Sequence, residues 1–228
     1  MNDIFGQALL DYFKQIEQHP LWINNKYGPK EEMPVDVYFR EEEEMPDLEL
    51  LALNECRGNV LDIGAGAGSH ALILQQRDIE VTALDISAYA VDIMHQRGVK
   101  KVIQKDIFEF NTGKYDTLLL LMNGIGLTGN LIKLKFFLQH AKELLSRGGQ
   151  LLFDSSDIAY LYNGNPPADG YYGELWYQYV YKKQRTDWFQ WLYIDKGLLK
   201  NIADETGWIT EILYEDEMDQ YLARLVLK

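Results

Sequence analysis

The stretch Val60-Leu61-Asp62-Ile63-Gly64-Ala65-Gly66-Ala67-Gly68-Ser69-His70 decides the fold of this chain. A short apolar run stops at three glycines separated by single alanines, and a helix-like pattern follows. Further along, Asp85 ends a second apolar run, Val81-Thr82-Ala83-Leu84. The order strand, glycine turn, helix, strand and acid is typical of an open parallel sheet that binds a ribose-bearing cofactor. Glycines let the backbone approach the ligand, and the acid accepts hydrogen bonds from ribose hydroxyls.

The glycine spacing distinguishes between cofactor classes. A dinucleotide fingerprint, G-x-G-x-x-G, requires glycine at its sixth position, but Ser69 stands there and the third glycine comes one residue early, at Gly68. No G-x-x-x-x-G-K-[ST] sequence occurs, so the phosphate-binding loop of nucleoside triphosphatases is missing. The spacing argues against a nicotinamide oxidoreductase. A glycine turn with a purely structural role stays open as an alternative.

Four further features follow in order. A third apolar segment, 101–104, precedes Asp106-Ile107, and a fourth, 115–122, precedes Asn123-Gly124-Ile125-Gly126. A predicted helix ends at Gly148-Gly149, with Gly148 as its expected C-cap, and a fifth strand follows. This alternation of strands and helices predicts a parallel sheet with right-handed crossovers.

The D-x-G-x-G-x-G form and the ordered segments resemble the class I S-adenosylmethionine (SAM)-dependent methyltransferases, most clearly over residues 58–157. The resemblance implies an α/β fold: a seven-stranded, mostly parallel Rossmann-like sheet closed by antiparallel C-terminal strands. It also implies SAM as the cofactor. The cofactor-binding residues that it implies are Asp62, Gly64, Ala65, Gly66, Gly68, Asp85, Ile86, Asp106, Ile107 and Asn123.

Each implied role has a simpler structural alternative. Asp85 is expected to bind the ribose hydroxyls, or else to act as a helix N-cap. Asp62 is expected to hold the amino group of SAM, or else to bond the backbone amides of the turn. The three glycines would bring the backbone close to the methionine moiety. Asp106 and Ile107 are expected at the adenine edge and Ile86 on the adenine face; the alternatives are a solvated turn acid and core packing.

Asn123 is the candidate catalytic residue, because the end of the fourth strand faces donor and acceptor in this family. Family members that modify amides and amines often carry N/D-P-P-Y there, and this chain does not, so that chemistry is not supported. The similar Asn165-Pro166-Pro167-Ala168 follows the fifth strand, lacks the aromatic residue and is expected to be a loop. His70 is expected to be partly buried near the cofactor; a catalytic base is the alternative.

The composition argues against several classes of binding partner. The formal charge of −13 argues against nucleic acid and anionic membrane surfaces as partners, because binding phosphates depends on Lys and Arg contacts. The four histidines have no metal-ligand spacing and only one cysteine is present, so no metal is predicted. No apolar run reaches the length of a membrane span, and the N-terminus does not resemble a signal peptide. A cytoplasmic location is expected.

The chain is expected to form one domain, 1–228. Residues 1–57 would be a helical cap with an amphipathic helix over 1–18, an irregular segment over 27–40 and a second helix over 47–56. Residues 58–157 would be the SAM-binding core, and 158–228 a hairpin insertion with closing strands.

The C-terminal part is expected to begin with an aromatic hairpin over 174–194, turning at 183–186. Asp195 is a predicted N-cap for a helix ending at Thr206-Gly207, and 208–214 and 220–227 are predicted strands. The hairpin carries aromatic side chains on both faces of its alternation, which favours core packing or an interface, with a possible homodimer, over a substrate wall.

The sequence predicts transfer of a methyl group from SAM to a small-molecule acceptor. Methyl transfer depends mainly on alignment of the reacting atoms, so a conspicuous catalytic residue is not required. The alternative is a non-catalytic protein that senses SAM or binds a partner.

Overall fold

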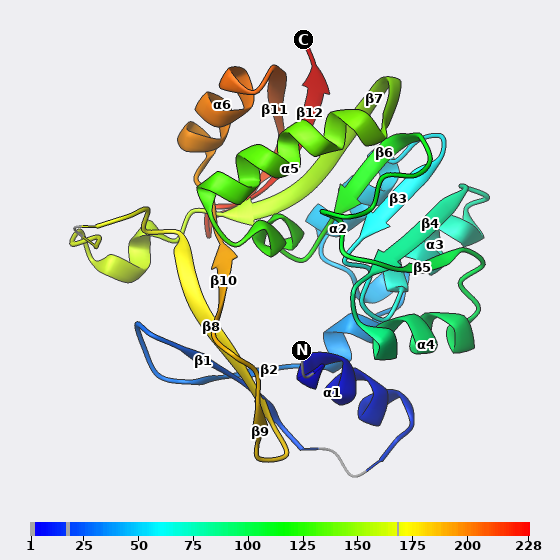
Figure 1. Cartoon of the computed structure of the whole chain (residues 1–228), viewed down its shortest axis with the longest axis vertical. Coiled ribbons are helices and arrows are strands. Elements are labelled where there is room, and N and C mark those ends of the chain that lie inside the picture. The colour runs from blue at the N-terminus through cyan, green and yellow to red at the C-terminus, as the bar shows by residue number, and fades with distance from the viewer. Residues whose placement is uncertain (1–2, 17–18, 168) are drawn as a thin grey trace. The chain divides into compact units, whose positions relative to one another are not determined.

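The computed structural model describes residues 3–16, 19–167 and 169–228 (Figure 1). The chain divides into two compact units, each built from three segments: 1–45, 62–110 and 176–189 in the first, and 46–61, 111–175 and 190–228 in the second.

The α-helices are α1 (Ile4–Phe13), α2 (Asp47–Glu55), α3 (Ser69–Gln76), α4 (Ala88–Arg97), α5 (Leu131–Leu144) and α6 (Lys196–Glu205). The strands are β1 (Leu21–Asn25), β2 (Glu31–Met33), β3 (Val60–Ile63), β4 (Val81–Asp85), β5 (Val102–Gln104), β6 (Tyr115–Leu120), β7 (Leu145–Ser156), β8 (Glu174–Tyr181), β9 (Gln184–Arg185), β10 (Phe189–Leu192), β11 (Trp208–Glu215) and β12 (Gln220–Leu227). Short 3-10 helices span Asp36–Phe39, Glu42–Glu44, Gly124–Thr128 and Ala159–Tyr162.

The larger sheet has seven strands in the order β11-β12-β7-β6-β3-β4-β5. The pairs β4–β5 and β6–β7 are parallel, whereas β12 runs antiparallel to both β7 and β11. The central strands β3 and β4 are mostly apolar, and all of their residues but Asp85 are buried, which is typical of parallel strands covered on both faces. The predicted seven-stranded Rossmann-like fold is confirmed.

In the first unit, α1 packs over the glycine turn and α4. Leu9 and Leu10 form a buried cluster with Ala67 of the turn and Ile93 of α4. The predicted helix over 1–18 is therefore present as α1. Residues 1–2 and 17–18 of that prediction lie outside the described residues, as does residue 168 of the predicted Asn165–Ala168 loop.

A smaller antiparallel sheet in the first unit joins β1 to β2 and to β8, and β9 pairs with β8. Strand β2 lies in the segment 27–40, where an irregular chain was expected. It carries charged Glu31 and Glu32, so its own pattern gives no strand signal. The hairpin turns at Lys182 and Lys183, not at 183–186. Both have positive φ, 45° and 67°, which suits the twist of a two-residue hairpin loop.

In the second unit, α5 passes directly into β7. The helix ends at Leu145, whose N–H donates to the Ala141 carbonyl, so the prediction of Gly148 as its C-cap is wrong. Gly148 has φ +78° and lies within β7, where the register to β6 shifts between Tyr115/Leu145 and Thr117/Gln150. The left-handed conformation of Gly148 therefore belongs to an irregularity within strand β7 and does not end the helix.

The predicted caps of α6 are confirmed. The Asp195 carboxylate accepts a hydrogen bond from the Leu198 N–H at 2.9 Å, which satisfies one of the free donors of the first turn. The helix ends at Thr206, and Gly207 follows with φ +83°.

Candidate cofactor site

The carboxyl ends of β3, β4 and β5 bring the predicted cofactor residues of the first unit to one edge of the sheet. Parallel strands end on the same side, so the glycine turn, Asp85-Ile86 and Asp106-Ile107 all follow a strand there. The Gly64 and Ala65 N–H groups donate to the Leu84 carbonyl at 2.8 and 3.1 Å. These bonds tie the start of the turn to the end of β4.

Asp85 links the turn to the start of α4. One carboxylate oxygen accepts from the Gly66 N–H and the other from the Ser87 N–H, both at 2.8 Å. Burial raises the pKa of Asp85 to about 6, although these backbone donors act to lower it. A carboxylate offers about four acceptor sites. The Gly66 and Ser87 amides each bond a different oxygen, so each oxygen of Asp85 keeps acceptor capacity beyond these bonds.

The alternative role of Asp85 as a helix N-cap is filled by its neighbour Ser87. The Ser87 hydroxyl oxygen accepts from the Ala90 N–H at 3.0 Å and so caps α4. Asp85 itself bonds the glycine turn through the Gly66 N–H and the residue before α4 through the Ser87 N–H, so it is not the cap of the helix.

Asp62, at the end of β3, is 2 % exposed. Burial raises its pKa to about 6; the electrostatic interaction with His70 acts to lower this pKa, and that with Asp85 acts to raise it. The Asp62 Oδ2 atom is buried without a hydrogen-bond partner among the described residues. Buried carboxylate oxygens are rarely left unpaired, so this atom is placed for a donor that a ligand would supply.

The last glycine of the turn has a packing role. Gly68 has φ +83°, and a Cβ there would lie 2.8 Å from Met94 Cγ on α4 and 3.0 Å from Val99 Cγ2. A larger residue would therefore push α3 away from α4. Gly66 differs, because a Cβ there would meet only the Tyr38 ring, at 3.4 Å.

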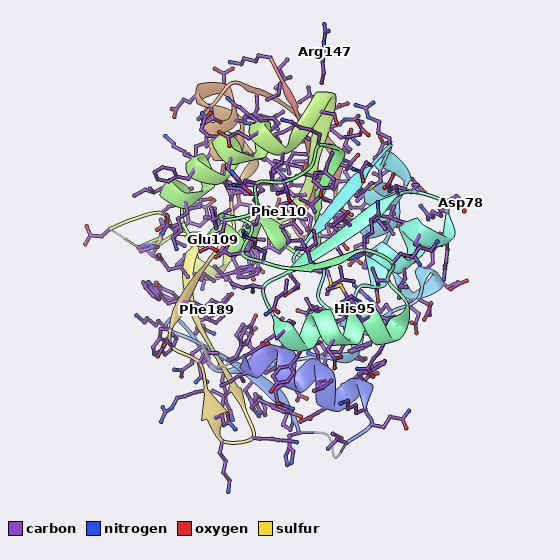
Figure 2. The ribbon with its side chains drawn as sticks, turned by 45° about the vertical axis from the view of Figure 1, so that its right-hand side comes forward. Asp78, His95, Glu109, Phe110, Arg147 and Phe189 are labelled. Carbon is purple, nitrogen blue, oxygen red and sulfur yellow. The ribbon has the colours of Figure 1, made fainter. Side chains whose placement is uncertain are left out.

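Residues 106–110, which follow β5, place a polar side chain next to apolar ones. Asp106 Oδ1 accepts from the Phe108 N–H at 2.9 Å, and the intervening Ile107 is buried. The segment is anchored by buried Phe110, whereas its neighbour Glu109 is exposed (Figure 2). Phe108 is partly exposed, so it adds an apolar surface to this edge that the sequence did not single out.

Ile86 follows Asp85 directly at the edge of the sheet. Its apolar side chain is 63 % exposed. The core-packing alternative for Ile86 does not hold, because a core residue would be buried.

Two further residues of the first unit were not predicted at this edge. Tyr38 lies over the turn, and its carbonyl accepts from the Ser69 hydroxyl at 2.9 Å. Asp3, the N-cap of α1, accepts from the Ser87 hydroxyl at 2.6 Å and acts to raise the pKa of Asp85. The only sequence signal for Asp3 was its place before an amphipathic helix, because the contact joins residues 84 positions apart.

In the second unit, Asn123 occupies a left-handed turn directly after Met122, with φ 56° and 61°. Its backbone N–H donates to both oxygens of buried Asp154, at 2.8 Å each. Its side-chain Nδ2 lies 3.4 Å from the Leu192 carbonyl, and its Oδ1 is buried without a partner among the described residues. Such strained conformations concentrate at functional sites.

Asp154 is the anchor of this turn. Burial raises its pKa to about 6, while the Asn123 N–H and the Gln220 side chain, which donates at 3.1 Å, act to lower it. Gly126 lies in the same loop. The Trp191 indole packs against it so closely that a Cβ on residue 126 would overlap the ring. The glycines of 123–126 thus allow an aromatic ring to pack on the loop.

His70, which was expected to be partly buried, is buried at the start of α3 and interacts electrostatically with Asp62. Within residues 3–16, 19–167 and 169–228, no group of three or more His, Cys, Asp or Glu side chains is placed to hold a metal ion. None of the helices in the described part of the chain is both long enough and apolar enough to cross a membrane.

Comparison with known proteins supplies the family. A family described as "Methyltransferase domain" matches residues 38–209. A solved SAM-dependent methyltransferase from Bacteroides fragilis, in complex with S-adenosyl-L-homocysteine (SAH), is 38% identical; the match covers 99% of this chain and 94% of that one, with a TM-score of 0.91. The chain belongs to the SAM-dependent methyltransferases. This methyltransferase has no match in a sequence comparison with curated proteins.

More distant structures share the fold. The CcbJ methyltransferase from Streptomyces caelestis is 12% identical, covers 98% of each chain and superposes with a TM-score of 0.65. The PH0226 protein from Pyrococcus horikoshii is 17% identical over 79% of this methyltransferase and 88% of its own chain, with a TM-score of 0.62. At these identities the likeness concerns the architecture alone.

Proposed function

We propose that this methyltransferase transfers the methyl group of SAM to a small-molecule acceptor. The observation that carries the cofactor assignment is the Oδ2 of Asp62, which is buried without a partner among the described residues and near enough to Asp85 for that carboxylate to raise the pKa of Asp62. The residues proposed to bind SAM in the first unit are Asp62, Gly64, Ala65, Gly66, Gly68, Asp85, Ile86, Asp106 and Ile107, with Tyr38 over the turn. Asn123 is proposed in the second unit.

The residues fit the chemistry of SAM. Asp62 would accept from its ammonium group, because a buried anion without a donor is stabilised by a cationic one. Asp85 would accept from the two ribose hydroxyls with the acceptor capacity that its two oxygens keep. The exposed Ile86 would pack against adenine and so remove apolar surface from water. Asp106 would accept from the adenine amino group with its remaining oxygen.

When bound, SAM would supply a methyl group on a positively charged sulfur: an acceptor lone pair would form a bond to the methyl carbon, and the carbon–sulfur bonding pair would stay with sulfur to leave SAH. The protein then has to hold the acceptor in line and exclude water. Asn123 is the proposed catalytic candidate, because its buried Oδ1 has no donor within the described residues and its position is fixed by Asp154. This oxygen would accept a hydrogen bond from the acceptor.

A small molecule is favoured as the acceptor because the formal charge of −13 opposes binding of nucleic acid. The relatives named above do not specify the acceptor of this chain. A cytoplasmic location and a homodimer through residues 174–194 stay predictions, which cell fractionation and sedimentation velocity test.

The test is methyl transfer itself. The protein is incubated with SAM labelled in its methyl group and a size-fractionated metabolite extract, and both SAH and labelled product are followed. Formation of SAH with label in the low-mass fraction supports the proposal. Binding of SAM without SAH formation in any extract would favour the alternative, a non-catalytic SAM sensor.

A further inference from the structure

The glycine turn of residues 64–68 depends on other groups to keep its shape. Gly64, Gly66 and Gly68 have positive φ, 74°, 56° and 83°. Glycine adopts many backbone conformations, so a turn built on three of them keeps a single conformation only where other groups bond to it. The Leu84 carbonyl bonds the start of the turn and Asp85 bonds its middle. The end of the turn needs a partner of its own.

Arg97, the last residue of α4, bonds the end of the turn. Its Nη1 atom donates to the Ala67 carbonyl at 2.8 Å and to the Ser69 hydroxyl oxygen at 3.1 Å. These two acceptors stand on either side of Gly68, so one charged nitrogen spans the last bend of the turn. Hydrogen bonds from a charged donor are about twice as strong as those between neutral groups. Arg97 therefore fixes the end of the turn to α4.

The same guanidinium reaches the segment that covers the turn. The Ser69 hydroxyl, which accepts from Arg97, donates in turn to the Tyr38 carbonyl at 2.9 Å. The guanidinium carbon lies 5.2 Å from the centroid of the Phe39 ring, a cation–π contact with the next residue. The Tyr38 ring lies over Gly66, 3.4 Å from the place of a Cβ there. Arg97 thus holds both the glycine turn and the 3-10 helix of residues 36–39.

The surroundings of Arg97 strengthen these bonds. Ser69 is buried and Arg97 is partly buried. Burial lowers the pKa of Arg97, while the carboxylate of Glu41 acts to raise it. A hydrogen bond in such a place is stronger than in water, and an acceptor that loses its donor there is costly. Loss of the guanidinium would therefore favour a rearrangement of the Ala67 carbonyl.

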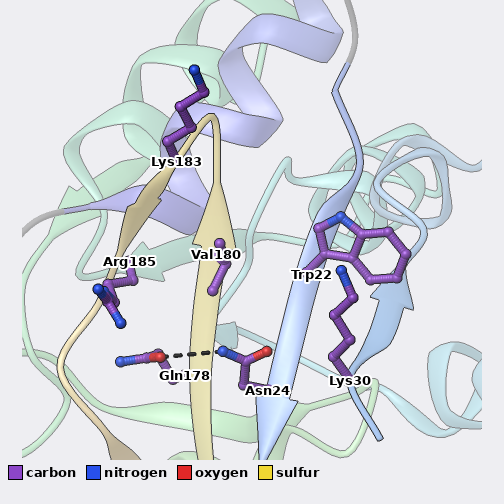
Figure 3. A pocket seen from close by; sticks show the side chains of 7 residues that line it. All are labelled: Trp22, Asn24, Lys30, Gln178, Val180, Lys183 and Arg185. Carbon is purple, nitrogen blue, oxygen red and sulfur yellow. Dashed lines mark hydrogen bonds between the residues drawn. The ribbon is translucent and has the colours of Figure 1, made fainter.

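The cations of the small sheet are arranged differently. Lys30 lies over Trp22, with its Nζ 3.9 Å from the ring centroid. Figure 3 shows the Lys183 side chain pointing away from Arg185. These side chains line a cavity of about 260 Å³ from separate sides. Arg97 differs, because a single nitrogen bonds two groups at the end of the glycine turn.

We propose that Arg97 is a positioning residue for methyl transfer, which holds the glycine turn and Tyr38 in the conformation that binds SAM. This inference rests on the proposed cofactor site, and Arg97 acts there through Ala67 and Ser69. The apparent affinity for a ligand falls in proportion to the fraction of protein in the binding conformation. A turn that keeps this conformation one tenth of the time would bind SAM ten times more weakly.

The test compares Arg97→Met with Arg77→Met. Methionine keeps an apolar stem but removes the charged donors, so Arg97→Met should bind SAH at least tenfold more weakly in titration calorimetry. Arg77 follows the other end of α3, where its guanidinium pairs with Glu42. Arg77→Met loses the same charge and should bind SAH as the wild type does. Urea denaturation of both variants separates a change in affinity from a change in stability.

Two further variants distinguish positioning from general destabilisation. Both bonds of Arg97 come from one nitrogen, so Arg97→Lys, which keeps one charged nitrogen, should bind SAH at least threefold more tightly than Arg97→Met. Ser69→Ala breaks the link to Tyr38. The double variant Arg97→Met/Ser69→Ala should bind SAH within twofold of Arg97→Met, because both changes interrupt one series of hydrogen bonds.

The outcomes separate this inference from the proposed function. If the wild type binds SAH and a folded Arg97→Met protein binds it within twofold, or if Arg77→Met loses as much affinity, the inference is overturned and the proposed function stands. If the wild type does not bind SAH, the proposed function fails and the inference falls with it. If Arg97→Met does not fold, Ser69→Ala decides: a loss of threefold or more supports the inference, and an unchanged affinity overturns it.

Discussion

Replacement of Asp85 by Asn tests the cofactor assignment most directly. The carboxylate accepts from Gly66 and Ser87, and the acceptor capacity that its two oxygens keep is assigned to the ribose hydroxyls. An amide keeps one oxygen and turns the other acceptor into a donor. One ribose bond is therefore lost, and the other loses its charge assistance. With about 1.5–3 kcal/mol for a charged hydrogen bond and about 1 for a neutral one, SAH binding should weaken by about 2–5 kcal/mol, roughly 30- to 5,000-fold.

The same variant should change stability much less. Burial raises the pKa of Asp85 from 3.8 to about 6, a difference of about 2.2, so its charge costs about 3 kcal/mol at neutral pH. Asn removes that cost. It also places its NH₂ group against the Gly66 or Ser87 N–H, which costs about 1–3 kcal/mol. The two effects oppose each other, and the free energy of unfolding should shift by no more than about 2 kcal/mol.

The assay is titration calorimetry with SAH at pH 7.5, together with urea denaturation of each protein. Asp92→Asn is the matched control: Asp92 lies exposed on α4, accepts a hydrogen bond from the Gln96 side chain at 2.9 Å and undergoes the same change of charge. Its SAH affinity should equal that of the wild type. If a folded Asp85→Asn protein binds SAH within twofold of the wild type, the ribose has been assigned to the wrong residue.

Three further predictions follow from buried groups of the first unit. Because burial raises the pKa of Asp62 and of Asp85 to about 6, both lose charge as pH falls below 6; SAH affinity should drop more than tenfold between pH 7.5 and 5 by calorimetry, and a constant affinity would contradict the assignment of both. Gly68→Ala should lower the free energy of unfolding by about 1–3 kcal/mol in urea, because its Cβ meets Met94 and Val99. Gly98→Ala, with similar positive φ but open space, should cost only about 1 kcal/mol, so equal losses would refute the crowding argument. Although burial by itself raises the pKa of Asp11, bonds from Lys182, Tyr181 and Gln7 bring it below 3.8 overall. Its stabilisation is thus present above pH 3.8 and is lost as pH falls through the lowered folded-state pKa. Asp11→Ala should lower the free energy of unfolding by about 2–3 kcal/mol at pH 7, and a loss at pH 7 no larger than at pH 3 would contradict this reasoning.

The sequence predicted the parts of the fold whose signals are local. Asp195 was recognisable as an N-cap because a cap bonds an amide only three residues away. The strand over 60–63 and the glycine turn were recognisable because a buried parallel strand reads as an apolar run and a left-handed turn selects glycine. Gly148 was misassigned because its positive φ satisfies a helix C-cap and a strand irregularity equally well.

Over residues 58–157, the sequence by itself therefore determined the order of strands and helices, the Rossmann-like class and which residues stand at the carboxyl ends of the strands. Backbone conformation and hydrophobic periodicity are properties of short segments, so they can be read from neighbouring residues. Only the tertiary structure decided that Trp22 stands opposite Val180, that Asp3 reaches Ser87 and that an oxygen of Asp62 is buried with no donor from the described part of the chain. Strand pairing and the burial of charge depend on residues far apart in the chain. Their free energies depend on contacts that form only when the chain is folded, so they cannot be read from neighbouring residues.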